Sequence, residues 1–138
     1  MSYLIDTNVL SELKRKVPDQ GVVEWFAQRP SQILYLSMLT LGEIRKGVEG
    51  VKDARRRQRL SDWLESDLRQ FFYGRILSVD AAVADRWGCL VADAGRPLPV
   101  VESLLAATAL THDLVLVTRN VQDFAGLPVQ LCNPWSPP

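Results

Sequence analysis

The chain is poor in cysteine and histidine, and each shortage excludes a class of site. Its two cysteines, Cys89 and Cys132, lie far apart and lack the spacing of a metal-binding pair. We therefore expect two buried free thiols in place of a disulfide framework or a zinc site. The single histidine, His112, leaves little for a nucleophilic triad or a histidine-rich metal site, and we place it at a helix C-terminus.

Long apolar runs and glycine-rich loops are also missing. No run of about 18 apolar residues occurs, so no transmembrane helix is expected. The first residues form a strand pattern in place of the basic and then apolar pattern of a secretory signal, and we expect a cytoplasmic protein with no membrane contact. Gly42 and Gly47 are isolated, and no Walker-type or G-x-G-x-x-G loop indicates nucleotide binding.

Charge of one sign is not in excess, since sixteen Lys and Arg residues balance sixteen Asp and Glu residues. No overall field therefore attracts a polyanion. The basic residues are nonetheless clustered, first at 14–16 and then within the segment 52–59, as Lys52, Arg55, Arg56, Arg57 and Arg59. A solvated helix face, paired with the acids that follow at Asp62, Glu65 and Asp67, and a nucleic-acid contact are both open interpretations.

Short apolar runs alternate with segments of helical period, which predicts an α/β fold with a mostly parallel sheet of about five strands flanked by helices. The runs of strand length are Tyr3–Ile5, Ile33–Ser37, Ile76–Val79, Val115–Val117 and Val129–Cys132. The helical segments are Val9–Lys14, Gln20–Gln28, Leu41–Gly50, Asp53–Phe72, Ala81–Ala94 and Val100–Thr111. At 138 residues we expect a single domain, 1–138, whose C-terminal tail, 132–138, is held to the body by Trp135.

Four carboxylates lie just after predicted strands or in the first turn of predicted helices. They are Asp6, Glu43, Glu102 and Asp123. Each one alone has an ordinary explanation as a turn residue or as the complement of a helix dipole. Because the carboxyl ends of parallel strands meet at one edge of a sheet, where open α/β sheets bind ligands, we expect all four to converge there.

Converging carboxylates repel one another and need a counter-charge. Oxygen ligands of this kind suit Mg²⁺ or Mn²⁺, which polarise a phosphodiester and help to form the attacking hydroxide. The sequence therefore predicts hydrolysis of phosphate esters. A haloacid-type phosphatase also begins with a strand and an aspartate, but Asn8 stands where its second aspartate belongs.

Five ordered blocks, spread over essentially the whole chain, resemble the PIN-domain ribonucleases, and among them the VapC-type toxins of type II toxin–antitoxin pairs. The blocks are Leu4–Asn8, Leu41–Glu43, Pro97–Ala109, Val117–Phe124 and Asn133–Trp135. The resemblance implies an endoribonuclease dependent on Mg²⁺ or Mn²⁺, with Asp6, Glu43, Glu102 and Asp123 as metal-binding and catalytic residues. Thr7, Asn8, Thr118 and Asn120 would then orient these ligands.

The resemblance also implies two kinds of protein partner. A VapB-type antitoxin would place its C-terminal segment in a groove between helices and block the acidic site, and the toxin would form a homodimer. One departure matters, because Glu102 stands where the family usually has aspartate. That departure keeps open the alternative of an inactive PIN-like scaffold that binds RNA or a protein partner, and transfer, ribosomal and messenger RNA all remain possible substrates.

Overall fold

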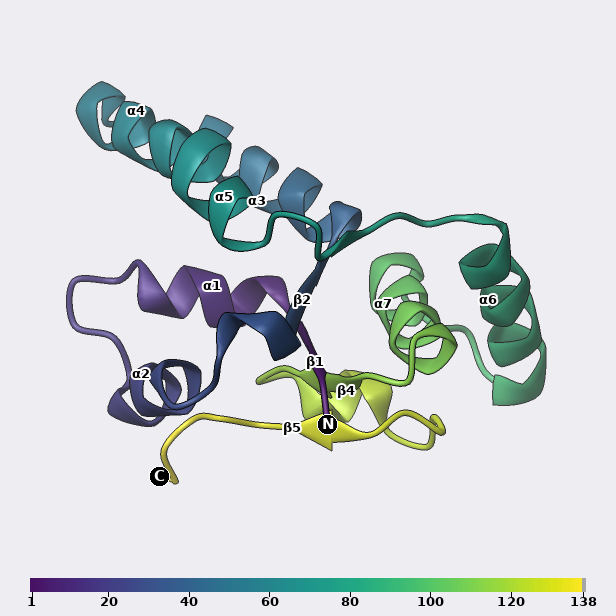
Figure 1. Cartoon of the computed structure of the whole chain (residues 1–138). Helices are drawn as coiled ribbons and strands as arrows, with labels where there is room; N and C mark the ends of the chain where they lie inside the picture. The colour runs from purple at the N-terminus through teal and green to yellow at the C-terminus, as the bar shows by residue number, and fades with distance from the viewer. Residues whose placement is uncertain (138) are drawn as a thin grey trace.

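The computed structural model describes residues 1–137 and is built around a five-stranded sheet in the order β3-β2-β1-β4-β5 (Figure 1). All neighbouring strands are parallel, which confirms the predicted α/β fold. The chain passes from β1 outward to β3 and then crosses to the other side of β1. The topological switch point therefore lies between β1 and β4. The strands are β1 (Tyr3–Ile5), β2 (Leu34–Ser37), β3 (Ile76–Leu77), β4 (Val115–Val117) and β5 (Leu131–Cys132).

Helices alternate with these strands as the sequence predicts, and α6 and α7 have the predicted bounds. The predicted helix Asp53–Phe72 is a continuous helical segment that changes to a π-helix, η2, in its middle. The helices are α1 (Thr7–Leu13), α2 (Gln20–Ala27), η1 (Ser31–Ile33), α3 (Met38–Glu49), α4 (Ala54–Asp62), η2 (Trp63–Leu68), α5 (Arg69–Phe71), α6 (Ala81–Ala94), α7 (Val100–Thr111) and η3 (Val121–Phe124).

Both faces of the sheet are covered, because successive residues of a strand point to opposite faces. Ile5 joins a fully buried cluster with residues of α1, α2, α3 and η2. Leu4 joins a second cluster with residues of α6, α7 and η3. Each such buried Leu or Ile contributes about 1.5–3 kcal/mol. In Figure 1, α1 and α2 lie on one side of the strands and α6 and α7 on the other.

Helix α3 begins three residues earlier than predicted, and this changes the position of Glu43. Ser37, the last residue of β2, is also the N-cap of α3, and its hydroxyl accepts a hydrogen bond from Leu39 N at 3.1 Å. A serine N-cap lets the helix start directly at the strand end. Glu43 therefore lies in the second turn, not the first as predicted, and complementing the helix dipole does not explain it.

The C-terminal segment is fastened to the start of α2. Ser136 Oγ accepts a hydrogen bond from Gly21 N at 3.0 Å and donates one to Asp19 Oδ2 at 3.1 Å. A Cβ at Gly21 would lie 2.8 Å from Pro134 O, so only glycine permits this close approach. Trp135 packs against the core cluster of Ile5, which agrees with its predicted role, although Cys132 belongs to β5 and not to the tail.

Three smaller predictions have mixed outcomes. Both cysteines are free in the described part of the chain, as expected, but neither is fully buried: Cys89 is exposed on α6 and Cys132 is half-buried in β5. His112 is the C-cap of α7, as predicted. Among residues 1–137, no helix has both the length and the apolar character needed to cross a membrane.

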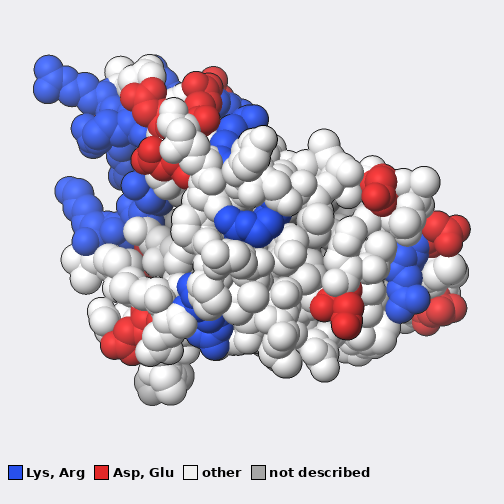
Figure 2. Space-filling view, viewed as in Figure 1, with Lys and Arg blue, Asp and Glu red and all other residues white. Residues whose placement is uncertain are grey.

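The surface charge is uneven although the net charge is zero. In Figure 2 the basic side chains gather at the end of the molecule formed by α4 and by the turn that follows α1. The opposite end, around α6, carries mainly scattered acidic side chains in this view.

Candidate active site

Asp6 occupies the centre of the candidate site, at the topological switch point. Its backbone N–H donates to Val117 O at 3.0 Å, which continues the pairing of β1 with β4 by one residue. The residue is only 7% exposed. It accepts hydrogen bonds from Thr7 N at 2.7 Å, as the N-cap of α1, and from Thr118 Oγ1 at 2.8 Å.

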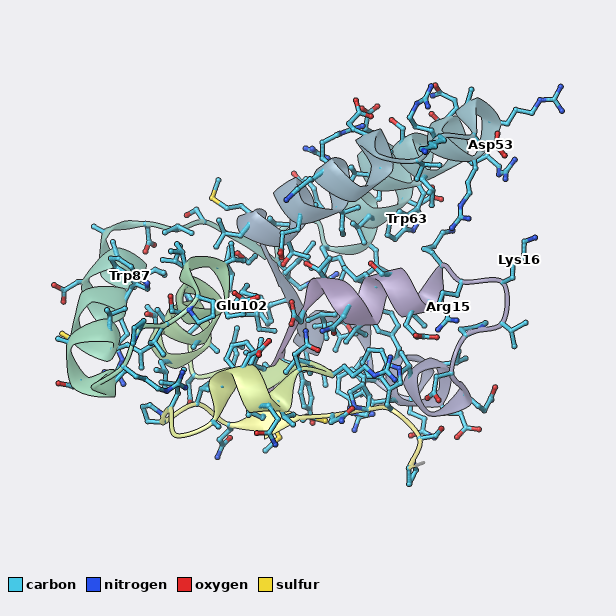
Figure 3. The ribbon with its side chains drawn as sticks, turned by 180° about the vertical axis from the view of Figure 1, so that it is seen from behind. Arg15, Lys16, Asp53, Trp63, Trp87 and Glu102 are labelled. Atoms are coloured by element: carbon cyan, nitrogen blue, oxygen red, sulfur yellow. The ribbon has the colours of Figure 1, made fainter. Side chains whose placement is uncertain are left out.

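Two further carboxylates lie around the same pocket, a hollow of about 560 Å³. Glu43 comes from α3, and its Oε1 accepts a hydrogen bond from Thr7 Oγ1 at 2.7 Å. Glu102 comes from the first turn of α7, on the side of that helix that faces α1 (Figure 3). Ala106 and Ala109 of α7 are fully buried, and their small side chains let α7 pack close enough to bring Glu102 to the pocket.

None of these three carboxylates forms an ion pair within residues 1–137. Burial is the main reason that the pKa of Asp6 is raised, and the charges of Glu43 and Glu102 raise it further, against hydrogen bonds that lower it. Within residues 1–137, the ion pairs join Arg15 or Arg45 to other acids, and none reaches these three. A divalent cation is the counter-charge that such a donor set fits.

The arrangement also limits how an ion could be held. No three Asp, Glu, His or Cys side chains in the described part of the chain lie close enough together to enclose an ion as they stand. Mg²⁺ commonly binds through one or two carboxylates and keeps several waters. Asp6 with Glu43 or Glu102 is therefore a fitting set of ligands, with water in the remaining positions.

A polar network holds the Asp6 carboxylate in place. Asn8 Nδ2 lies 3.4 Å from Asp6 Oδ2 and 3.3 Å from Thr118 Oγ1. Thr118 Oγ1 in turn accepts a hydrogen bond from Asn120 N at 3.0 Å while it donates to Asp6. The residues predicted to orient the ligands thus contact a carboxylate directly, except Asn120, which acts through Thr118.

Asp123 is not brought to the pocket. It lies on η3 with its side chain exposed, whereas the next residue, Phe124, is 1% exposed and anchors η3 in the core. The turn after β4 directs Asn120 to the pocket lining instead. The expected convergence is therefore found for three of the four acids.

Sequence reasoning missed Glu12, a buried carboxylate that also lines the pocket. Its Oε2 accepts a hydrogen bond from Asp19 N at 2.9 Å and its Oε1 lies 3.3 Å from Arg15 Nη1. The Asp19 hydrogen bond is the main reason that the pKa of Glu12 is lowered. The sequence did offer one indication of this position. Glu12 follows Asn8 by four residues, and residues at that spacing share one face of a helix.

Arg119 and Trp135 were also missed, and they form the rim of the pocket. The Arg119 guanidinium lies 5.2 Å from the centre of the Trp135 ring, within the range of a cation–π interaction. The two residues are joined only by tertiary structure, so no local pattern could have paired them.

These features define a parallel α/β protein with an acidic pocket at the switch point of its sheet. The PIN domain model matches residues 3–128, and the chain belongs to the PIN domain family.

Similar proteins are found over almost the full length of the chain. The chain is 31% identical to VapC ribonuclease Y4jK of Sinorhizobium fredii, over 97% of this chain and 98% of that protein. It is 34% identical to toxin FitB of Neisseria gonorrhoeae, over 96% of this chain and 97% of that protein. The solved structure of FitAcB from Neisseria gonorrhoeae matches with a TM-score of 0.90 at 33% identity, covering 98% of this chain and 99% of that one. A toxin–antitoxin complex from Klebsiella pneumoniae matches with a TM-score of 0.73 at 27% identity, covering 99% of this chain and 100% of that one.

Proposed function

We propose that the protein is an endoribonuclease, dependent on Mg²⁺ or Mn²⁺, that acts as the toxin of a type II toxin–antitoxin pair. The observation that carries this proposal is the pocket at the switch point, which Asp6, Glu43 and Glu102 all line and where, within residues 1–137, none of the three forms an ion pair. The names of the relatives, a VapC ribonuclease and a toxin, support RNA as the substrate.

In this proposal Asp6 is the principal metal ligand, because it is the most deeply buried of the three carboxylates and is fixed from two sides by Thr7 and Thr118. Glu43 and Glu102 complete the acidic set, and Asp123 stays outside it. A bound Mg²⁺ or Mn²⁺ would polarise the phosphodiester and help to form the attacking hydroxide. The chain's own contribution is to hold the carboxylates, because the reaction rate depends steeply on the positions of the reacting groups.

No cysteine or histidine lines the pocket in the described part of the chain. The side chains that could bind an ion there do so through oxygen. Thr7 bonds both to Asp6, through its backbone N–H, and to Glu43, through its hydroxyl. One residue therefore fixes the spacing of two carboxylates, one at the N-cap of α1 and the other in α3. This spacing decides whether both can share one ion.

An antitoxin is the protein partner that this proposal requires. The similar solved structure from Klebsiella is named as a toxin–antitoxin complex, and the one from Neisseria is named FitAcB. On this chain, an apolar hollow of about 240 Å³ lies between α1, α2 and the η2–α5 segment. Its lining is largely aromatic and apolar and includes Leu13, Phe26, Trp63 and Phe71. We assign the antitoxin's C-terminal segment to this hollow, which shares Lys14 and Trp63 with a second hollow that Glu43 also lines.

Glu43→Gln tests the proposed function with a matched control on the same helix. The substitution removes a negative charge at the pocket, and we expect cleavage of a defined RNA pool with Mg²⁺ to fall by about 10- to 100-fold. Glu49→Gln makes the same chemical change at the exposed end of α3, where Glu49 pairs with Arg45, and cleavage should be unchanged. Equal rates for parent and Glu43→Gln would refute the assignment of Glu43.

Glu102→Asp restores the residue that the family usually has. Glu102 is partly exposed and outside the two core clusters, so shortening it by one methylene should leave the metal-free Tm close to that of the parent. We expect cleavage with Mg²⁺ to rise several-fold, or a preference for Mn²⁺ to disappear, because a small shift of a ligand alters the geometry of attack. If rate and metal dependence are both unchanged, Glu102→Gln will show whether Glu102 is a competent ligand or none.

A further inference from the structure

Two basic segments that are about forty residues apart in the sequence meet beside the acidic pocket. Lys14 and Lys16 come from the end of α1 and the turn after it, and Arg56 and Arg59 come from one face of α4. Together with Leu60 these four side chains line a hollow of about 240 Å³. Figure 3 shows Lys16 extending from that turn into the space beside the N-terminal end of α4. We call these four residues the basic cleft.

Two of the three acids that follow the basic residues of α4, Glu65 and Asp62, bond to other side chains, and the third, Asp67, forms no ion pair with the basic cleft within residues 1–137. Glu65 Oε1 lies 2.7 Å from Arg45 Nη2, and Asp62 Oδ1 accepts a hydrogen bond from Gln58 Nε2 at 2.9 Å. Within residues 1–137, no ion pair involves any residue of the basic cleft. Lys14 is held over the Trp63 ring, with Nζ 5.2 Å from the ring centre, which positions its charge without cancelling it. A solvated face paired with its own acids therefore does not describe this surface.

The basic cleft is continuous with the acidic pocket. Arg56 lines both of them, and it also lines a third hollow that lies between the two. The lining of that middle hollow includes Lys14 at one side and Glu43 at the other. A chain lying along these hollows would pass from four cations directly to the carboxylates.

We infer that the basic cleft binds the phosphate backbone of single-stranded RNA on one side of the bond to be cut. This inference rests on the proposed function and adds the path by which the substrate reaches the site. Uncompensated carboxylates repel a polyanion, and a neighbouring row of unpaired cations offsets that repulsion. A single strand fits best, because Asp6 is only 7% exposed and a rigid duplex cannot bend its backbone into such a recess.

The test compares two double variants with the same loss of charge. Arg56→Ala with Arg59→Ala removes two cations of the basic cleft. Arg55→Ala with Arg86→Ala removes one exposed cation of α4 that lines none of the hollows described here, and one on the distant helix α6. Binding of a labelled single-stranded RNA is measured by fluorescence anisotropy with a chelator present, so that no cleavage occurs, and over a range of salt concentrations.

We expect the cleft variant to bind RNA at least about tenfold more weakly. The slope of a plot of log Kd against log salt concentration should fall by about 1.4, because two cations are lost and each contact with a single strand contributes about 0.7. With Mg²⁺ its KM should rise while kcat stays near that of the parent. The control variant should match the parent in binding and cleavage. The variant Arg56→Lys with Arg59→Lys keeps both charges and should retain most of the affinity for RNA. It shows that the weaker binding of the alanine variant comes from the lost charges and not from misfolding.

Three results would overturn the inference or separate it from the proposed function. RNA binding by the cleft variant equal to that of the parent refutes it. Unchanged RNA binding together with weaker binding of polyglutamate would assign the basic cleft to an acidic protein segment and also refute it. The parent protein could also cut no RNA with any metal ion tested while the cleft variant alone loses RNA binding. That pair of results would support the inference and refute the proposed function.

Discussion

Asp6→Asn is expected to lower RNA cleavage by about 100-fold or more while the protein stays folded. The substitution keeps the size of the side chain but removes the charge that would attract the ion, at the most buried of the three carboxylates. The amide oxygen of asparagine can still accept a hydrogen bond from Thr7 N as the N-cap of α1, so the fold should persist. Initial rates on a defined RNA with Mg²⁺ in excess give the measurement.

The matched control is Asp123→Asn, which makes the same change at an exposed carboxylate outside the pocket. Its rate should stay within about twofold of the parent. If Asp123→Asn abolishes cleavage and Asp6→Asn does not, the structural assignment of the acids is wrong.

Asp6→Asn should also change stability with a definite dependence on pH. The pKa of Asp6 is raised from its ordinary value of 3.8, so the folded state favours the protonated form. This group therefore stabilises the metal-free protein fully below pH 3.8, and that contribution is lost as the pH rises through its folded-state pKa. Without divalent ions, Asp6→Asn should melt above the parent at neutral pH, and the difference should disappear below pH 3.8.

Divalent ions are expected to raise the Tm of the parent strongly. An ion that binds only the folded state stabilises it by about 2.7 kcal/mol at one hundred times its Kd. A domain of this size gains about 2–8 °C per kcal/mol, so the shift with Mn²⁺ should reach roughly 10 °C. The driving force is the relief of repulsion among Asp6, Glu43 and Glu102.

Two controls isolate this effect from general screening by salt. Sodium chloride at matched ionic strength should produce a much smaller shift, and Asp6→Asn should lose most of the response to Mn²⁺. A parent Tm that is indifferent to millimolar Mn²⁺ would contradict a metal site in this pocket.

The sequence predicted the fold wherever local signals mark the ends of elements. Helix α6 has its predicted bounds because Asp80 caps its start, accepting a hydrogen bond from Val83 N at 3.0 Å, and Gly95 ends it with φ of 68°. The start of α3 was misplaced because β2 runs into it without a turn, and Ser37 serves both elements. The π-helical turn at η2 leaves the apolar pattern of the segment intact, so periodicity cannot reveal it.

The candidate site divides in the same way. Asp6 and Thr118 each follow a buried strand at the switch point, and topology alone brings such residues together. The prediction that Asp123 reaches the pocket was wrong, because the direction of its side chain depends on how the single turn η3 is oriented. Phe124 sets that orientation by packing into the core. Arg56 and Trp135 reach the pocket only through the packing of α4 and of the C-terminal segment, and neither carries a local signal.

The chemical form of the RNA ends tests the central claim most directly. Hydrolysis by a water-derived nucleophile at the acidic pocket leaves linear monophosphates and free hydroxyls, whereas attack by the RNA's own 2′-hydroxyl leaves 2′,3′-cyclic phosphates. Mass spectrometry of the products should show only linear ends, formed with Mg²⁺ or Mn²⁺ and lost with a chelator. Cyclic phosphate ends, or the same products in the presence of the chelator, would contradict a metal-dependent ribonuclease site at Asp6, Glu43 and Glu102.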